Sequence, residues 1–327
     1  MNFYSDLEER LDKFLVAKLQ KSRSQIEKLI KKGYVKVDNK ITTKTGMKLQ
    51  IGQNVSISFP KATESEAKEV DFDIEKVYED NDILVINKPS GVVVHPAASY
   101  KGATLVDWLK SKGIRLSTLS GEERHGIVHR IDKETSGLLV VAKNNRAHQY
   151  LAQQLQTRQM GRYYLAIITP PLKENVIVDK PIGRNPKNRL KMSIIENGKE
   201  AKSAFVKIAQ SFDEKYELIG AKLFSGRTHQ IRVHLASINR HIVGDSLYGF
   251  KSKEATIARV FLHAYILYLE HPTSKKMMRF VAPLPQDMLA FLDAKFHREQ
   301  IDEKINPDIF DEWFNFSNRV WHTASAG

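Results

Sequence analysis

Asp132 is the residue whose surroundings in the sequence most directly suggest chemistry. It lies in the segment HRIDKETSGLLVVAKN between Arg130 and Lys133, and the apolar run that follows predicts a strand over 138–143. A shorter apolar run precedes the acid, so we expect Asp132 on a loop between two strands, where side chains often face a cleft. The neighbouring cations favour the ionised carboxylate, which can act as a nucleophile or a base. A lone Asp in such a loop is more often a turn or capping residue. Whether Asp132 is catalytic or structural therefore depends on the other motifs of the sequence.

A second candidate group lies in the segment SGRTHQIRVHLASINRHIVGDSLYG. Arg227 falls where a predicted strand turns into a predicted helix, and His229, Arg232 and His234 follow it closely. An arginine in that position can bind a carboxylate or a phosphate through two parallel hydrogen bonds. We therefore interpret Arg227 as such a bidentate partner. The alternative interpretation is a solvated basic helix face.

Two adjacent tyrosines occupy a predicted strand in the segment GRYYLAII. Because side chains alternate across a strand, Tyr163 and Tyr164 are expected on opposite faces. One of them belongs in the core. The other is available to stack on a nucleobase, an interaction worth about 1–3 kcal/mol per base.

Several classes of site are excluded by what the sequence lacks. It has no cysteine, which removes disulfides, thiolate catalysis and cysteine-ligated metal centres. It has no glycine-rich dinucleotide or nucleotide-phosphate motif and no H-E-x-x-H pair. His129, Asp132 and Ser136 have the residue types of a Ser–His–Asp catalytic triad, but the sequence has no G-x-S-x-G elbow, so we do not predict a triad. The absence of a run of 18 apolar residues and of a signal-peptide layout predicts a cytoplasmic protein without a membrane span.

The net charge favours a polyanionic partner. The 327 residues include 51 Lys and Arg against 38 Asp and Glu, a net charge of +13. Such an excess is typical of proteins that bind nucleic acid, although solubility alone can also account for it. Residues 1–60 hold twelve of the bases and six of the acids, whereas residues 296–327 hold three and six. We therefore expect the N-terminal end to contact nucleic acid.

Residues 1–60 predict a small unit of two helices and a hairpin. Apolar residues recur at helical spacing in RLDKFLVAKL and SRSQIEKLIKKG, and Gly33 stands where a helix C-cap is expected. YVKVDNKI and QNVSISF alternate as strands, with a turn at Asp38 and Asn39. So small a unit buries little core and suits docking better than catalysis. Its candidate contacts with nucleic acid are the basic residues in and around the second helix: Lys21, Arg23, Lys28, Lys31 and Lys32.

The rest of the chain predicts a linker over 61–70, a larger domain over 71–295 and a C-terminal extension over 296–327. Strands and helices do not alternate strictly, which favours an α+β fold with a largely antiparallel mixed sheet over a doubly wound one. Strands are expected at 82–87, 92–95, 126–131, 138–143, 163–168, 204–208, 216–224 and 261–269, and helices at 104–111, 146–158, 228–237 and 286–294. The extension is expected to pack on the domain as an added helix through Phe310, Trp313, Phe314 and Trp321.

These segments together resemble the RluA/RluD-type ribosomal RNA pseudouridine synthases. HRIDKETSG is similar to that family's H-R-L-D-x-x-T-S-G signature, RYYLA to its K/R-x-Y-x-A element, and SGRTHQIRVHLA with VGDSLYG to its T-G-R-T-H-Q-I-R-x-H-L…G-D-x-x-Y-G element. YEDNDILVINKPSGVVVHPA resembles its opening strands, and LHAYILYLEHP and FVAPLPQDM its closing strands. Residues 1–60 resemble the small S-four-like RNA-binding domain that many members carry in front. Asn239 and Arg240 depart from the family pattern, which indicates a loop that reaches RNA differently.

The resemblance implies isomerisation of uridine to pseudouridine in structured RNA, with large-subunit ribosomal RNA as the expected partner. It implies a reaction without cofactor or metal, carried out by a monomer. Asp132 matches the family's essential aspartate, Tyr164 is the tyrosine that stacks on the uracil, and Arg227 supplies the cation beside the acid. Arg130 stands where the family uses an arginine to fill the gap left by the flipped base.

Two other classes of function remain open at this point. A non-catalytic RNA-binding or ribosome-assembly protein could use the same fold, although a binder has no need of Asp132. A structural or protein-interaction role is the third class. A two-metal nuclease needs clustered carboxylates, and the sequence shows no such cluster.

Overall fold

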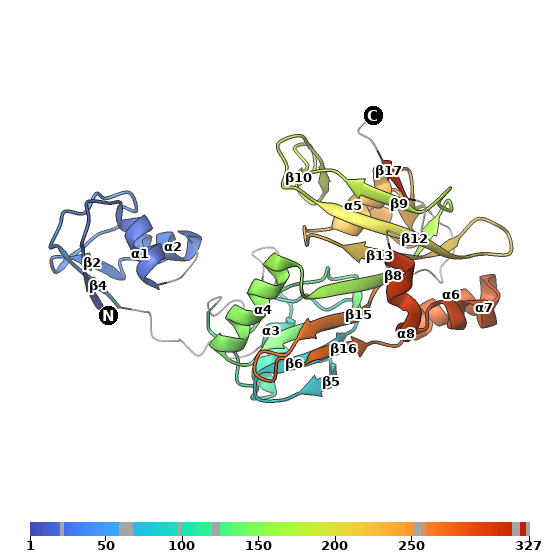
Figure 1. Cartoon of the computed structure of the whole chain (residues 1–327), viewed down its shortest axis with the longest axis horizontal. Helices are drawn as coiled ribbons and strands as arrows, with labels where there is room; N and C mark the ends of the chain where they lie inside the picture. Colours follow the sequence, from blue (N-terminus) through green and yellow to red (C-terminus); the bar gives the residue numbers. More distant parts are fainter. Residues whose placement is uncertain are drawn as a thin grey trace. The chain divides into compact units, whose positions relative to one another are not determined.

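The computed structural model describes residues 1–19, 23–58, 68–96, 100–119, 125–251, 257, 259–315 and 321–324, with the backbone alone for Ser24 and Gln25. The chain divides into two compact units, Met1–Glu66 and Ala67–Gly327 (Figure 1). Most of the predicted linker, and the candidate Lys21, lie outside the described residues.

The N-terminal unit packs two helices against a small antiparallel sheet of strand order β1-β4-β2-β3. Its elements are β1 (Asn2–Tyr4), α1 (Leu11–Leu19), α2 (Arg23–Lys31), β2 (Val35–Val37), β3 (Lys40–Ile41) and β4 (Asn54–Ile57). Phe14, Ile26 and Val35 are fully buried in its core. Asp38 and Asn39 adopt positive φ angles of 48° and 65° and close the β2–β3 hairpin at the predicted turn. Strand β1 was not predicted, because its three residues gain their hydrogen bonds from the distant β4.

Arg23, a candidate contact with RNA, takes part in a buried ion cluster of this unit. The Asp12 carboxylate is fully buried, and Arg10 Nε and Arg23 Nη2 each lie 2.9 Å from it. The hydrogen bond from Arg10, together with that from Arg23, lowers the pKa of Asp12 to about 2 against the opposing effect of burial. Arg23 is therefore engaged within the unit. The other described candidates have exposed side chains: Lys28, Lys31 and Lys32.

The larger unit is built on one long mixed sheet with the strand order β17-β9-β12-β13-β8-β15-β7-β6-β5, in which β14 also pairs with β8 and β16 with β15. Most pairs are antiparallel; β7–β15 and β9–β17 are parallel. The predicted α+β class is confirmed. The strands are β5 (Glu75–Glu79), β6 (Ile83–Lys88), β7 (Ser136–Ala142), β8 (Gly161–Thr169), β9 (Val176–Asp179), β12 (Lys202–Gln210), β13 (Glu217–Leu223), β14 (His241–Ile242), β15 (Leu262–Glu270), β16 (Met277–Val281) and β17 (His322–Ala324), and a separate hairpin joins β10 (Ile182–Arg184) and β11 (Met192–Ile194).

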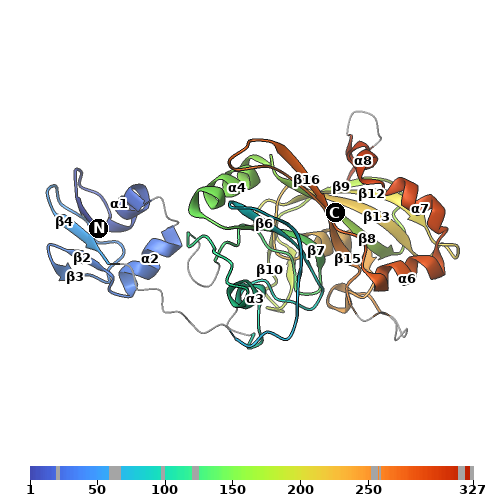
Figure 2. The same ribbon diagram turned by 90° about the horizontal axis from the view of Figure 1, so that it is seen from below.

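Helices flank this sheet (Figure 2), and most of their buried apolar residues belong to three hydrophobic cores. Tyr164 lies in the core that α3 and α5 cover, whereas Tyr163 lies in the core of α6, α7 and α8, so the predicted alternation is confirmed. The helices are α3 (Leu105–Ser111), α4 (Asn145–Thr157), α5 (Gln230–Ala236), α6 (Gln286–Lys295), α7 (Arg298–Lys304) and α8 (Pro307–Phe310). None of the helices in the described ranges is long and apolar enough to cross a bilayer.

The C-terminal extension packs on the larger unit through its aromatic residues, as predicted. Phe310 and Phe314 are buried, and the Phe314 ring stacks on Tyr163 with the centroids 5.0 Å apart. Trp313 and Trp321 pack against the same core. The described part of the extension forms two short helices, a 3₁₀ turn and strand β17 rather than one helix, because Pro307 starts a new helix after α7 has ended.

The strands expected at 92–95 and 126–131 are wrong. Each segment makes only an isolated bridge, between Val93 and Thr104 and between Ile127 and Val141. In the second segment the His129 side chain accepts a hydrogen bond from the Val140 N–H at 3.1 Å. In a regular strand pair the acceptor of this N–H would be a backbone carbonyl. The loop that carries Asp132 is therefore longer and less regular than expected.

Candidate active site

The loop that carries Asp132 is tied to the sheet by a buried lysine. Lys88 is fully buried at the end of β6, and its ammonium donates to the carbonyl oxygens of Pro89 at 2.7 Å, Val92 at 2.9 Å and Lys133 at 3.2 Å. The last of these carbonyls belongs to the residue that follows Asp132. Hydrogen bonds to a buried charged group are among the stronger ones in proteins, so Lys88 fixes the backbone from which the acid projects.

The burial of Lys88 predicts how stability depends on pH. Burial lowers the pKa of Lys88 to about 7, whereas an unfolded lysine titrates near pH ~10.4. Between these values the unfolded chain binds more protons, so the stability of the wild type relative to Lys88→Met should rise as the pH increases from about 7 to about 10. Urea denaturation of both proteins at several pH values in that window measures this difference. A difference that does not change with pH contradicts the prediction.

Asp132 is in contact with the guanidinium of Arg232. Arg232 Nη1 lies 3.4 Å from Asp132 Oδ2, and the side chains of Asp132 and Arg232 are 17% and 6% exposed. The same guanidinium binds Asp245 through both of its oxygens, Nε at 2.7 Å and Nη2 at 2.8 Å. These two hydrogen bonds to Asp245 fix the orientation of the Arg232 guanidinium, and its Nη1 group then faces Asp132.

The sequence predicted Arg227 as the partner of Asp132, and the structure corrects this assignment. Arg227 lines the same cavity, but its Nε donates to the carbonyl oxygen of Glu200 at 2.9 Å, and its side chain is exposed. The two arginines differ because helix α5 begins at Gln230. Arg227 therefore lies in the preceding turn, whereas Arg232 lies inside the helix on its buried side.

Asp132 opens into a small cavity of about 70 Å³. The structure brings four sequence-predicted residues to its wall: Asp132, Tyr164, Arg130 and Arg227. It adds Arg162 from the start of β8 and Arg232 from α5. One carboxylate among several cations, beside an aromatic ring, can act on a sugar or a base that enters from solvent.

Tyr164 is held in its neutral form in this cavity. Burial raises the pKa of its hydroxyl, and the charge of Asp132 raises it further, against the opposing effect of Arg162. A neutral tyrosine keeps its proton at physiological pH, so its hydroxyl can donate or relay a proton and its ring can stack on a base.

The turn between β13 and α5 is shaped by His229 and by Gln230, for which the sequence predicted no role. Gln230 accepts from Ser225 Oγ at 2.8 Å and from the Arg227 N–H at 2.9 Å, and it donates to the Lys202 carbonyl at 2.9 Å. His229 has a positive φ of 55° and lies with Nε2 3.9 Å from Asp132. The spacing T-H-Q-I-R could have indicated these roles, because a buried polar residue at the first turn of a short helix usually has a hydrogen-bond partner.

Comparison with known proteins identifies two families along the chain. The family model described as RNA pseudouridylate synthase matches residues 82–237, and that described as S4 domain matches residues 9–55. An uncharacterized RNA pseudouridine synthase of Helicobacter pylori is 47% identical over 309 residues, which cover 91% of this chain and 94% of that protein. Ribosomal large subunit pseudouridine synthase D of Nitrosomonas europaea is 37% identical over 294 residues, which cover 87% and 84%.

A solved structure agrees with these relatives. Human RNA Pseudouridylate Synthase Domain Containing 1 superposes with a TM-score of 0.55 and 28% identity, over 69% of this chain and 89% of that one. The matched range 82–237 contains Asp132, Tyr164 and Arg232. The chain therefore belongs to the RNA pseudouridine synthase family, and it is an isomerase of that family with an S4 domain near its N-terminal end.

Proposed function

We propose that this enzyme converts uridines of structured large-subunit ribosomal RNA to pseudouridine, with Asp132 as the catalytic residue. The observation that carries the proposal is the ion pair of Asp132 with Arg232 at the cavity that Tyr164 also lines. The choice of RNA is supported by the relative named ribosomal large subunit pseudouridine synthase D. We further propose that the enzyme acts as a cytoplasmic monomer.

The reaction is an isomerisation in which no atom is gained or lost overall. The bond between N1 of uracil and C1′ of the ribose breaks, the base turns, and C5 forms the new bond to C1′. The C5 proton leaves and N1 carries a proton in the product. Asp132 acts on the sugar, either by adding to C1′ or by removing a sugar proton; both routes need an ionised carboxylate, and Arg232 contacts this carboxylate at 3.4 Å. No cofactor or metal is required.

The neighbouring side chains prepare the nucleotide for this reaction. Tyr164 stacks on the uracil, and its neutral hydroxyl relays the proton that leaves C5. Arg130 is exposed and lines the cavity, and it fills the gap that the flipped nucleotide leaves in the RNA. Arg227, which is also exposed, contacts an RNA phosphate. Flipping costs a few kcal/mol and least in loops, so unpaired or irregular RNA is the preferred target.

The reaction itself is tested with an in vitro transcript of large-subunit ribosomal RNA that carries [5-³H]uridine. The purified full chain should release tritium without added metal or nucleotide. A transcript that keeps its label under conditions where the protein binds it contradicts the proposed function.

Removal of residues 1–66 tests the role of the S4 domain. The truncated protein should bind RNA more weakly, because Lys28, Lys31 and Lys32 are exposed and available to phosphates. Each lost phosphate contact should lower the slope of log affinity against log salt by about 0.7 on single-stranded RNA. Isomerisation at saturating RNA should change little, since Asp132 and its partners belong to the other unit. Filter binding at several salt concentrations measures the slope. An unchanged slope means that the N-terminal unit does not contact RNA.

A further inference from the structure

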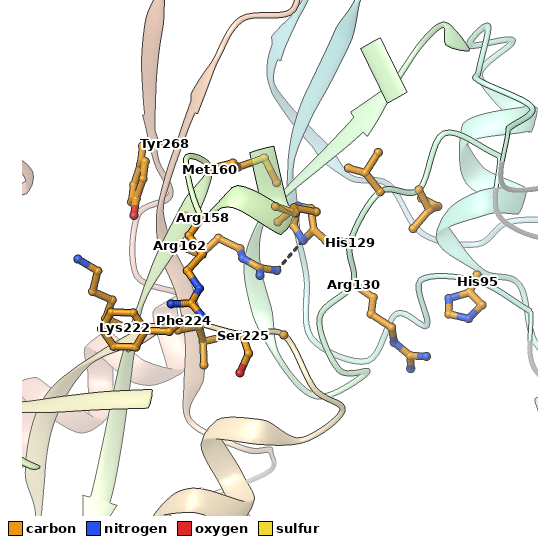
Figure 3. A pocket seen from close by; sticks show the side chains of 16 residues that line it. His95, His129, Arg130, Arg158, Met160, Arg162, Lys222, Phe224, Ser225 and Tyr268 are labelled. Carbon is orange, nitrogen blue, oxygen red and sulfur yellow. Dashed lines mark hydrogen bonds between the residues drawn. The ribbon is translucent and has the colours of Figure 1, made fainter. Parts of the chain in front are cut away.

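A second and larger cavity lies beside the candidate active site. Its volume is about 620 Å³, which is within the usual range of small-molecule sites. The end of α4, the first residues of β8, the end of β13 and the segment around His129 form its walls. Figure 3 shows Arg158 and Arg162 between Lys222 and Phe224 on one side and His129 and Arg130 on the other.

The wall of this cavity is positively charged. Its 16 lining residues include four cations and no Asp or Glu. The cations come from four different parts of the fold: Arg130, Arg158, Arg162 and Lys222. Like charges brought together at one surface repel each other, so the arrangement favours an anionic ligand.

Arg162 is the strongest indication of such a ligand. Its side chain is 8% exposed, and its Nε has no hydrogen-bond partner. Its Nη1 lies 3.0 Å from His129 Nδ1. Burial and the charge of Arg162 hold the pKa of His129 well below its usual range, so this histidine is neutral and does not balance the charge of Arg162. Among the described residues, no carboxylate forms an ion pair with Arg162. A buried guanidinium without an acid is costly, and a phosphate would compensate it.

The two cavities are continuous along the wall. Arg130, Arg162, Leu223 and Gly226 line both of them. A strand whose uridine enters the cavity of Asp132 therefore has its neighbouring phosphate and nucleotide within reach of the larger cavity. Partly buried Phe224 and buried Met160 add apolar surface there for a base.

We propose that the larger cavity binds an unpaired nucleotide adjacent to the target uridine, with its phosphate at Arg158 and Arg162. This inference rests on the proposed function, because it places the cavity on the path of the substrate strand. It assigns the site a ligand class, a nucleotide of single-stranded RNA. The site contributes affinity and fixes the register of the strand; it does not take part in bond making.

Arg158 is the residue through which the inference is best tested. Its side chain is exposed, and it ends α4 with a positive φ of 63°, a conformation that Asn and Asp tolerate. Arg158→Asn and Arg158→Asp therefore remove or reverse the charge without disturbing the fold. Arg162 is less suitable, because it also lines the cavity of Asp132. Lys215→Asn is the matched control, since Lys215 is exposed just before β13, at the opposite end of that strand from Lys222.

The expected result is a loss of affinity without a loss of turnover. With the [5-³H]uridine transcript, Arg158→Asn should raise KM about tenfold, the equivalent of 1.4 kcal/mol, and leave kcat within a factor of about two. Arg158→Asp should raise KM further. The salt slope of binding should fall by about 0.7 for the lost contact, and Lys215→Asn should match the wild type. Thermal melting of the three variants confirms that each is folded.

A binding measurement separates this inference from the proposed function. The same substitutions in an Asp132→Asn background, which binds RNA without turnover, give the dissociation constant and the salt slope directly. If Arg158→Asn changes neither value, the cavity does not hold the RNA strand, whether or not the wild type releases tritium. If the wild type releases no tritium while Arg158→Asn weakens binding, the proposed function fails and the cavity still binds RNA.

Discussion

Replacement of Asp132 by Asn is expected to abolish tritium release from [5-³H]uridine-labelled RNA. The change preserves the shape of the side chain and removes its charge, so neither addition to C1′ nor removal of a sugar proton remains possible. The loss of turnover should be roughly 10⁴-fold or more, in the range seen when other enzymes lose a catalytic carboxylate. RNA affinity should stay within a few-fold, because the cations that surround the cavity remain in place.

Glu134→Gln is the control for this experiment. Glu134 lies two residues further along the same loop, where the Ser90 hydroxyl donates to its carbonyl oxygen rather than to its side chain. The substitution therefore removes a carboxylate from the loop without disturbing the backbone contact, and turnover should be close to that of the wild type. Appreciable turnover by Asp132→Asn would show that Asp132 is not the catalytic residue.

Arg232→Lys is expected to lower kcat on the order of a hundredfold and to change KM little. The arginine spans Asp132 and Asp245 with N–H groups on both sides of its planar fork, and a lysine keeps the charge but cannot bind both acids in fixed directions. A displacement of a catalytic group by about 1 Å is enough for an effect of that size. Arg232→Ala is less informative, because it would leave the carboxylate of Asp245, only 1% exposed, without its cation, at a cost of about 3–5 kcal/mol in stability.

Arg227→Ala distinguishes the two arginines. If Arg232 is the partner of Asp132, loss of the proposed phosphate contact of Arg227 should raise KM and leave kcat within a few-fold. Single-turnover kinetics of both variants, with melting temperatures as a check on folding, measure the difference. A large loss of kcat in Arg227→Ala together with a normal kcat in Arg232→Lys would restore the assignment made from the sequence.

The long apolar elements could be predicted from the sequence because their periodicity is local. Tyr163 and Tyr164 occupy opposite faces of β8 as alternation requires, and Asp38 and Asn39 close the hairpin that their turn propensity indicates. Elements that depend on distant partners could not be predicted in this way. Strand β17 is three residues long and exists through its pairing with β9, more than a hundred residues earlier.

Most residues of the candidate site could be predicted from the sequence, but the contacts between their side chains could not. Asp132 was identified because it lies among cations and hydroxyls, which is a property of neighbours in sequence. Its pairing with Arg232 joins residues 100 positions apart, and it depends on where α5 begins and on which side of that helix is buried. Lys88 gave no signal for a similar reason: its three acceptors are backbone carbonyls, and one of them is 45 residues away.

The most direct test of catalysis by Asp132 is a map of pseudouridine in large-subunit ribosomal RNA from cells that lack this gene. We expect that at least one position loses pseudouridine, that the wild-type gene restores it, and that a gene encoding Asp132→Asn does not, although the variant protein is present in equal amount. Identical maps with and without the gene, or full restoration by Asp132→Asn, would contradict the proposed function.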